Sequence, residues 1–165
     1  GFVIAQEQRG FFVAPISAAD LREIADLRIL LECNALRLSI ENGDTDWEGS
    51  VAAAHHKLHR MEQQMLSGDE TQKELWKRYD AEFHQSLISA CGSRNLMELH
   101  AMIYDKYLRY QMQILTYRGD QAANEHKHLY EATLDRDIDR ADKLLRHHIE
   151  SGLKHTLEES ASLQD

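Results

Sequence analysis

Apolar residues recur at intervals of three and four along most of this chain, which is the period of amphipathic α-helices. Six such segments follow one another and are joined by short connections. They are expected over residues 17–42, 46–67, 71–91, 94–118, 121–135 and 137–159. Long amphipathic helices with short connections predict an all-α fold, an antiparallel helical bundle.

Polar caps and glycines mark the ends of these helices. Ser17, followed by Asp20, resembles a capping box at the start of the first helix, and Asp137 is expected to cap the sixth. Four glycines fall at predicted helix ends, where a left-handed residue is needed. They are Gly43, Gly68, Gly92 and Gly119.

The first sixteen residues have a different pattern. Two short apolar runs, 2–5 and 11–14, flank a polar stretch, which predicts a β-hairpin. Pro15 then marks a break. We therefore divide the chain into a hairpin and linker at 1–16 and a helical domain at 17–165.

Composition narrows the class of protein. At 165 residues and 42% apolar content the chain can bury the core of one globular domain. A net charge of −9 argues against nucleic-acid binding by this surface. The two cysteines, Cys33 and Cys91, form no metal-type pair and fit a reducing cytoplasm. The chain has no apolar run of about 18 residues, so we expect no membrane span. It begins with Gly1, which suggests a fragment of a longer protein.

Four ionisable residues fall inside the apolar arcs of predicted helices: Asp80, His84, His126 and His148. A buried charge or imidazole is costly unless it is paired or bound to a metal. One carboxylate and three imidazoles suit a divalent transition metal. The alternative is a set of core histidines satisfied by hydrogen bonds. Asp80 and His84 are neighbours four residues apart on one helix, which fits either a hydrogen-bonded pair or half of a metal site.

Other polar residues also lie near the apolar faces. Arg28 occupies a position in the apolar stripe of the first helix, where it could pair with Glu32 or bind a carboxylate ligand in bidentate fashion. His155 lies one heptad after His148 and is expected to face the same cavity. His100 borders an apolar arc, and His55 with His59 is interpreted as a pair at a helix edge.

These residues and their surroundings resemble a known family. Asp80-x3-His84, Glu125-His126 and His148-Ile149 are similar to the metal motif of the effector-binding C-terminal domain of GntR-type transcription regulators, FadR subfamily. Three longer segments resemble its helix signatures: ADLRILLE at 25–32, EHKHLYEA at 125–132 and RDIDRADKLLRHHI at 136–149. The resemblance covers about 17–159.

The resemblance implies a bundle of six or seven helices in a homodimer. It implies that the four inward residues hold a divalent metal, zinc or nickel, and that a small organic acid docks beside it. Arg28, Tyr130 and His155 are the candidate effector contacts. RGFFVAPIS, residues 9–17, looks like the end of a winged helix-turn-helix whose recognition helix is absent. Operator DNA would then be bound only through the missing N-terminal domain.

The sequence therefore predicts a ligand-sensing domain of a transcription regulator and not an enzyme. A helical metalloenzyme is the main alternative, because open metal positions can activate water. However, no inward carboxylate is evident beside the four proposed ligands. A di-iron oxidase needs inward Glu-x-x-His motifs, and Glu125 with His128 is predicted to face solvent. A dimerisation module with a structural metal and no effector is the third hypothesis.

Overall fold

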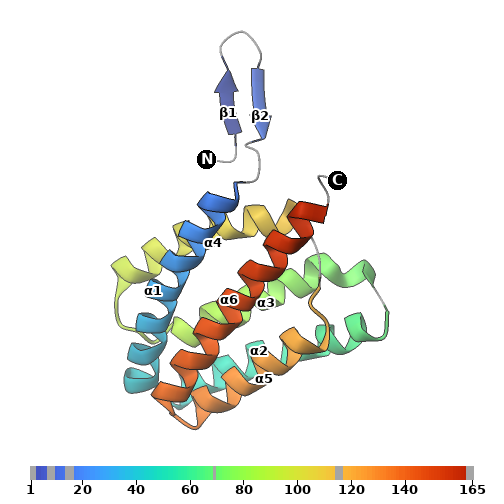
Figure 1. Cartoon of the computed structure of the whole chain (residues 1–165). Helices are drawn as coiled ribbons and strands as arrows, with labels where there is room; N and C mark the ends of the chain where they lie inside the picture. Colours follow the sequence, from blue (N-terminus) through green and yellow to red (C-terminus); the bar gives the residue numbers. More distant parts are fainter. Residues whose placement is uncertain (1–2, 7–9, 14–16, 69, 114–116, 163–165) are drawn as a thin grey trace.

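The structure is a computed structural model that describes residues 3–6, 10–13, 17–68, 70–113 and 117–162. Six α-helices make up most of the described chain, in agreement with the all-α prediction (Figure 1). They are α1 (Ala18–Asn42), α2 (Thr45–Leu66), α3 (Lys73–Ile88), α4 (Arg94–Gln113), α5 (Asp120–Leu134) and α6 (Ile138–Ser162). A short 3-10 helix, η1 (Glu70–Gln72), precedes α3.

The helices pack as two pairs, and α1 contacts three further helices. Helix α2 packs against α3, and α5 packs against α6; α2 and α5 join the two pairs. Helix α1 lies alongside α6 and also contacts α4 and α3 (Figure 1). Fully buried apolar side chains such as Phe83, Leu129 and Leu145 fill the main core between them. A smaller core cluster joins α1 to α4.

The two predicted helix caps are confirmed. The Ser17 hydroxyl accepts a hydrogen bond from the Asp20 amide over 3.2 Å, and the Asp137 carboxylate accepts one from the Arg140 amide over 3.1 Å. Asp20 does not close a reciprocal box, because its carboxylate accepts from Tyr110 and Arg109 of α4. The start of α1 is thereby tied to α4.

Three of the four helix-end glycines adopt the predicted left-handed backbone: Gly68, Gly92 and Gly119 have φ of 94°, 72° and 61°. For Gly43 the prediction is wrong, since its φ is −66°. The constraint there is steric: a Cβ at Gly43 would lie 2.1 Å from the Trp47 ring and 2.6 Å from the Ser39 carbonyl oxygen. Only glycine allows this close approach.

Arg136 connects the turn between α5 and α6 to the end of α1. It is the one non-glycine residue with positive φ in the described chain, at 56°. Its guanidinium donates to the carbonyl oxygens of Ile40 and Gly43 over 2.6 and 2.7 Å and to Glu48 over 2.6 Å. These bonds satisfy carbonyls that the end of α1 leaves open and offset the unfavourable backbone of Arg136.

Helix ends differ from the predicted boundaries mainly around α3 and α4. Helix α3 is shorter than 71–91, because η1 takes its first turn and the chain leaves the helix after Ile88. Helix α4 is described to Gln113, and residues 117–118 are not helical, so the prediction of helix through 118 is wrong there. Residues 114–116 lie outside the described chain.

Two strands precede the helices. β1 (Val3–Gln6) pairs antiparallel with β2 (Gly10–Val13), with Val3 opposite Val13 (Figure 1). Pro15 lies outside the described residues, and the interpretation of 1–16 as the remnant of a winged helix stays a prediction. Within the described chain, no helix combines the length and the apolar character that crossing a bilayer requires.

Candidate metal centre

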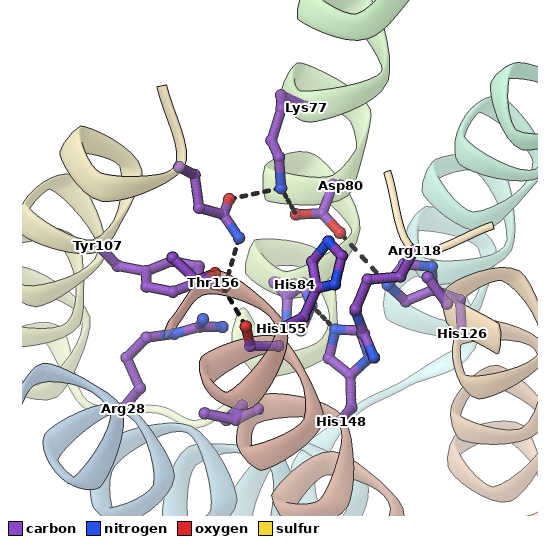
Figure 2. Close-up of a pocket in the computed structure, with 14 residues that line it drawn as sticks. Arg28, Lys77, Asp80, His84, Tyr107, Arg118, His126, His148, His155 and Thr156 are labelled. Carbon is purple, nitrogen blue, oxygen red and sulfur yellow. Dashed lines mark hydrogen bonds and ion pairs between the residues drawn. The ribbon is translucent and has the colours of Figure 1, made fainter. Parts of the chain in front are cut away.

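Four side chains from three helices meet in the interior of the bundle. Asp80 and His84 come from adjacent turns of α3, His126 from α5 and His148 from α6 (Figure 2). One ligand atom from each residue lies within 4.8 Å of all the others, and all four residues are buried. The residues that the sequence singled out are therefore brought together.

The ring Nε2 atoms of the three histidines face one another and Asp80. His84 Nε2 lies 3.2 Å from His148 Nε2. His126 Nε2 lies 3.3 Å from Asp80 Oδ1 and is buried without a hydrogen-bond partner among the described residues. The site thus holds a carboxylate oxygen and three imidazole nitrogens directed at one point.

A different glutamate contacts the Nδ1 atom of each histidine. His84 Nδ1 lies 3.1 Å from Glu32 of α1, His126 Nδ1 lies 2.6 Å from Glu62 of α2, and His148 Nδ1 lies 2.8 Å from Glu125 of α5. These three bonds are all side chain to side chain. A carboxylate can only accept, so each bond places a proton on Nδ1 and leaves Nε2 directed inward. Carboxylate–histidine pairs of this kind orient and strengthen metal ligands.

The sequence-based expectation that no inward carboxylate accompanies the ligands is wrong. Glu32 and Glu62 are both fully buried. Glu62 lies one turn from Leu58 and Met65, so its place on the apolar arc of α2 was readable from the spacing. Glu125 also departs from prediction, because it turns its carboxylate onto His148 at the edge of the site.

The electrostatics of the site depend on a positive charge at its centre. Two Nε2 lone pairs facing each other at 3.2 Å repel unless a cation or a proton lies between them. Burial, reinforced by the nearby His126, lowers the pKa of His148 to about 3. Burial also lowers the pKa of His84, although Glu32 opposes it. These two rings are therefore neutral and available as ligands at neutral pH.

His126 behaves in the opposite way. Burial lowers its pKa, but the nearby carboxylates of Asp80 and Glu62 outweigh burial and raise the pKa to about 9. Burial raises the pKa of Asp80, and the neighbouring Lys77 and His126 overcome this and hold it well below its usual range. Without a metal, His126 is therefore protonated at neutral pH and lies between the Asp80 and Glu62 carboxylates.

The arrangement fits a divalent metal ion. Metal–ligand bonds of about 2.1 Å put neighbouring ligand atoms about 3–4 Å apart, and the four ligand atoms here lie within 4.8 Å of one another. A set of three imidazoles and one carboxylate suits zinc, nickel, manganese or iron. No other such group of metal-binding side chains occurs in the described part of the chain.

A small cavity adjoins the four residues. Its volume is about 30 Å³, room for about two water molecules. Arg28 and His155, both predicted as effector contacts, line it (Figure 2). Sequence reasoning did not single out the other polar residues that line it. These are Lys77, Tyr107, Gln111, Arg118 and Thr156.

Arg28 forms the ion pair that the sequence left open as one of two alternatives. Its guanidinium donates two hydrogen bonds to Glu32, over 2.6 and 3.2 Å. The group also lies over the rings of Tyr104 and Tyr107, 4.8 and 4.2 Å from their centroids. Burial would raise the pKa of Glu32, but Arg28 and the histidines outweigh burial and hold it well below its usual range.

Tyr130 lies away from the cavity where the effector contact was expected. It is not among the described residues that line the cavity, and its ring stacks on His55 of α2 with centroids 4.2 Å apart. Tyr130 lies one turn after His126, on a side of α5 that contacts α2. The structure gives no contact between Tyr130 and this cavity among the described residues.

The remaining histidines take supporting positions. His100 is buried, with Nε2 3.2 Å from Glu32. His55 and His59 stack on each other with centroids 6.0 Å apart, as expected for a pair at a helix edge. His128 is exposed, as predicted, so an inward Glu-x-x-His motif is not formed.

The chain is similar to known proteins over most of its length. The profile of the FCD domain family matches residues 23–151. The chain is 37% identical over 154 residues to the uncharacterized HTH-type transcriptional regulator BphR of Paraburkholderia xenovorans LB400, covering 92% of this chain and 62% of that protein. It is 29% identical over 157 residues to the HTH-type transcriptional repressor GlaR of Escherichia coli K12, covering 89% and 69%. The chain thus spans about three fifths of the length of BphR.

Solved structures share the fold. A GntR family regulator from Pseudomonas syringae pv. tomato DC3000 aligns with a TM-score of 0.72 at 24% identity, covering 99% of this chain and 65% of that one. The metal-free FCD domain of TM0439, described as a putative transcriptional regulator, aligns with a TM-score of 0.71 at 18% identity, covering 90% and 99%.

Proposed function

The chain belongs to the FCD domain family, and from this premise we propose that it is the metal-dependent sensing domain of a GntR-type transcription regulator. In this proposal residues 17–165 bind a divalent metal, zinc or nickel, and a small carboxylate effector. Residues 1–16 are the wing hairpin and linker of a DNA-binding domain that precedes them in a longer protein. Effector binding then modulates DNA binding by that protein.

One observation carries the proposal. Three imidazole Nε2 atoms and an Asp80 oxygen are directed at one buried point, and each Nδ1 atom is held by its own carboxylate. Core histidines that only satisfy hydrogen bonds would not need to direct three Nε2 atoms at one buried point. When bound, the metal supplies a Lewis-acidic anchor for an anionic ligand.

The helices around the site explain how a ligand could alter the whole domain. The ligand set and the cavity combine side chains of α1, α3, α4, α5 and α6, with Arg118 from the segment before α5. A ligand that prefers one packing of these helices shifts the population toward that packing. In a homodimer such a shift would change the spacing of the two DNA-binding domains, to which operator recognition is sensitive.

The metal is tested by elemental analysis of the purified chain. We expect one divalent ion per chain in the wild type and in His128→Ala, whose side chain is exposed on the same helix as His126. Asp80→Ala and His126→Ala should each lose that stoichiometric metal. Equal metal in all four proteins would rule out this ligand set. A native mass spectrum of the same samples would report the number of subunits.

The effector is tested by isothermal titration of the metal-loaded chain with a panel of small carboxylic acids. We expect saturable heat from at least one of them and none with Asp80→Ala. Full metal occupancy without a response to any acid would instead favour a structural metal in a dimerisation module. The metalloenzyme alternative gains no support from the cavity, because Asp80 is the one acid among its described lining residues and is already a proposed ligand.

A further inference from the structure

Two of the three cations at the cavity are already neutralised by a carboxylate. Arg28 is paired in bidentate fashion with Glu32. Arg118 is paired in the same way with Glu125, over 3.2 and 2.8 Å. The positive charge of each guanidinium is therefore compensated by the carboxylate that it binds.

Lys77 is different. Its side chain is about nine-tenths buried, and its ammonium donates to the Gln111 amide oxygen over 2.6 Å. Among the described residues its closest carboxylate is Asp80, at 3.9 Å, and that carboxylate is also directed at His126. The ammonium lies 4.2 Å from the centroid of the Trp76 ring. Lys77 therefore has donors to spare beside the proposed metal ligands (Figure 2).

The sum of the formal charges around the site also favours a negatively charged ligand beside Lys77. Four carboxylates surround it: Glu32, Glu62, Asp80 and Glu125. If the imidazoles are neutral, the positive charges of the three cations and of a divalent metal ion exceed the negative charges of the four carboxylates by one. An uncompensated buried charge is costly, so a partner of opposite sign is expected.

We propose that Lys77 is the receptor for the negative charge of the effector, and that the effector is a small organic acid carrying a single negative charge. This inference rests on the proposed function. Lys77 lies three residues before Asp80, so an anion that contacts its ammonium also lies beside the metal ligands. The small cavity volume restricts the acid to a few heavy atoms unless the bundle opens.

The test compares acetate with acetamide, a neutral molecule of the same shape, on the Co²⁺-loaded chain. Binding is followed through the visible absorption of the cobalt, and cobalt content is checked by elemental analysis. We expect acetate to bind the wild type at least about tenfold more tightly than acetamide, as expected for a hydrogen bond to a charged group.

Two variants, each with its own control, test whether Lys77 causes the preference for acetate. Lys77→Met should weaken acetate about tenfold or more and leave acetamide unchanged, whereas Lys57→Met, at an exposed lysine, should change neither. Gln111→Glu keeps the lysine but gives it an internal carboxylate, so it should also weaken acetate. Gln111→Met is its uncharged control and should keep the preference for acetate.

The outcomes separate this inference from the proposed function. A wild type that takes up no cobalt overturns both. A wild type that is fully loaded but binds acetate no better than acetamide, or not at all, overturns the role of Lys77 alone. The same holds if Lys77→Met and Gln111→Glu, with full cobalt content, bind acetate within about twofold of the wild type.

Discussion

Glu62 Oε1 lies 2.6 Å from Nδ1 of His126, and both side chains are completely buried. The bond joins α2 to α5 across the interior of the bundle. Asp80 lies 3.3 Å from the opposite nitrogen of the same ring. His126 is thus held between two carboxylates, one that sets its proton on Nδ1 and one that shares the inward face with Nε2.

Replacing Glu62 should weaken metal binding without removing a ligand. Glu62→Gln keeps an oxygen that accepts from Nδ1 but loses the charge that makes the imidazole a stronger ligand. We expect metal affinity to fall about 10–100-fold. Competition with a chelating indicator measures it, and Glu82→Gln, at a half-exposed glutamate on α3, is the control. An affinity equal to that of the wild type would show that Glu62 only fills space.

Metal binding should release a proton from His126. Its pKa of about 9 means that the ring is protonated at neutral pH, and Nε2 must lose its proton before it can bind a metal. We expect about one proton released per metal at pH 7.5 and an affinity that rises about tenfold per pH unit up to pH 9. Isothermal titration in buffers of different ionisation enthalpy counts the protons. A heat that does not depend on the buffer would contradict the prediction.

The stability of the metal-free protein should be highest near neutral pH. The raised pKa of His126 contributes stability that is complete below pH 6.5 and is lost as the pH rises through 9. The lowered pKa of His148, about 3, contributes stability that is present above pH 6.5 and is lost as the pH falls toward 3. Urea midpoints at pH 5, 7 and 10 measure both sides.

The metal-loaded protein is the control for this pH dependence. Its His126 ring is already deprotonated, so the alkaline loss should be absent when unfolding is followed with metal in excess. If the metal-free and metal-loaded midpoints fell in parallel between pH 7 and 10, the alkaline loss would have to arise from another group.

Arg28 should contribute far more to stability than a surface arginine of the same helix. Arg28→Ala leaves the buried Glu32 carboxylate without its guanidinium partner, which costs about 3–5 kcal/mol. Arg37 pairs with Glu41 at the same spacing, but both side chains are more than 40% exposed, so Arg37→Ala should cost less than about 1 kcal/mol. Urea unfolding of the two variants compares them. Similar losses would mean that the buried pair is not held as the structure has it.

Two glycines should respond to alanine in opposite directions. Gly43→Ala forces a Cβ into the Trp47 ring and should destabilise by about 1–3 kcal/mol. Gly49 lies within α2 and has no atom within 4 Å of an added Cβ, so Gly49→Ala should stabilise by about 0.5–1 kcal/mol. Thermal unfolding of the two variants shows the signs. A stabilising Gly43→Ala would contradict the close packing at the end of α1.

Much of the fold was predictable from local signals. The helices, the caps at Ser17 and Asp137 and the left-handed Gly68, Gly92 and Gly119 depend on residues within one or two turns of chain. The prediction failed at Gly43 because the need for glycine there does not come from its own backbone conformation. Its backbone is ordinary, and the requirement for glycine comes from the ring of Trp47.

The candidate site was predictable in its ligands and less so in its supporting residues. The helical period marks Asp80, His84, His126 and His148 as inward, and the family resemblance groups them. Neither the helical period nor the family resemblance says which carboxylate contacts which imidazole. Glu62 and His126 are 64 residues apart, as are His84 and His148. The helical period correctly places Tyr130 on the inward side of α5, but it cannot show that this side chain packs toward α2 and not toward the cavity.

By itself, the sequence determined which residues face inward, because the spacing of side chains along a helix depends only on its geometry. Tertiary structure alone decided which inward groups share a point, because that depends on the relative height and rotation of helices that are distant in the chain. Those two quantities pair each histidine with its glutamate, leave Asp80, at 3.9 Å, as the closest described carboxylate to Lys77 and place Tyr130 outside the cavity.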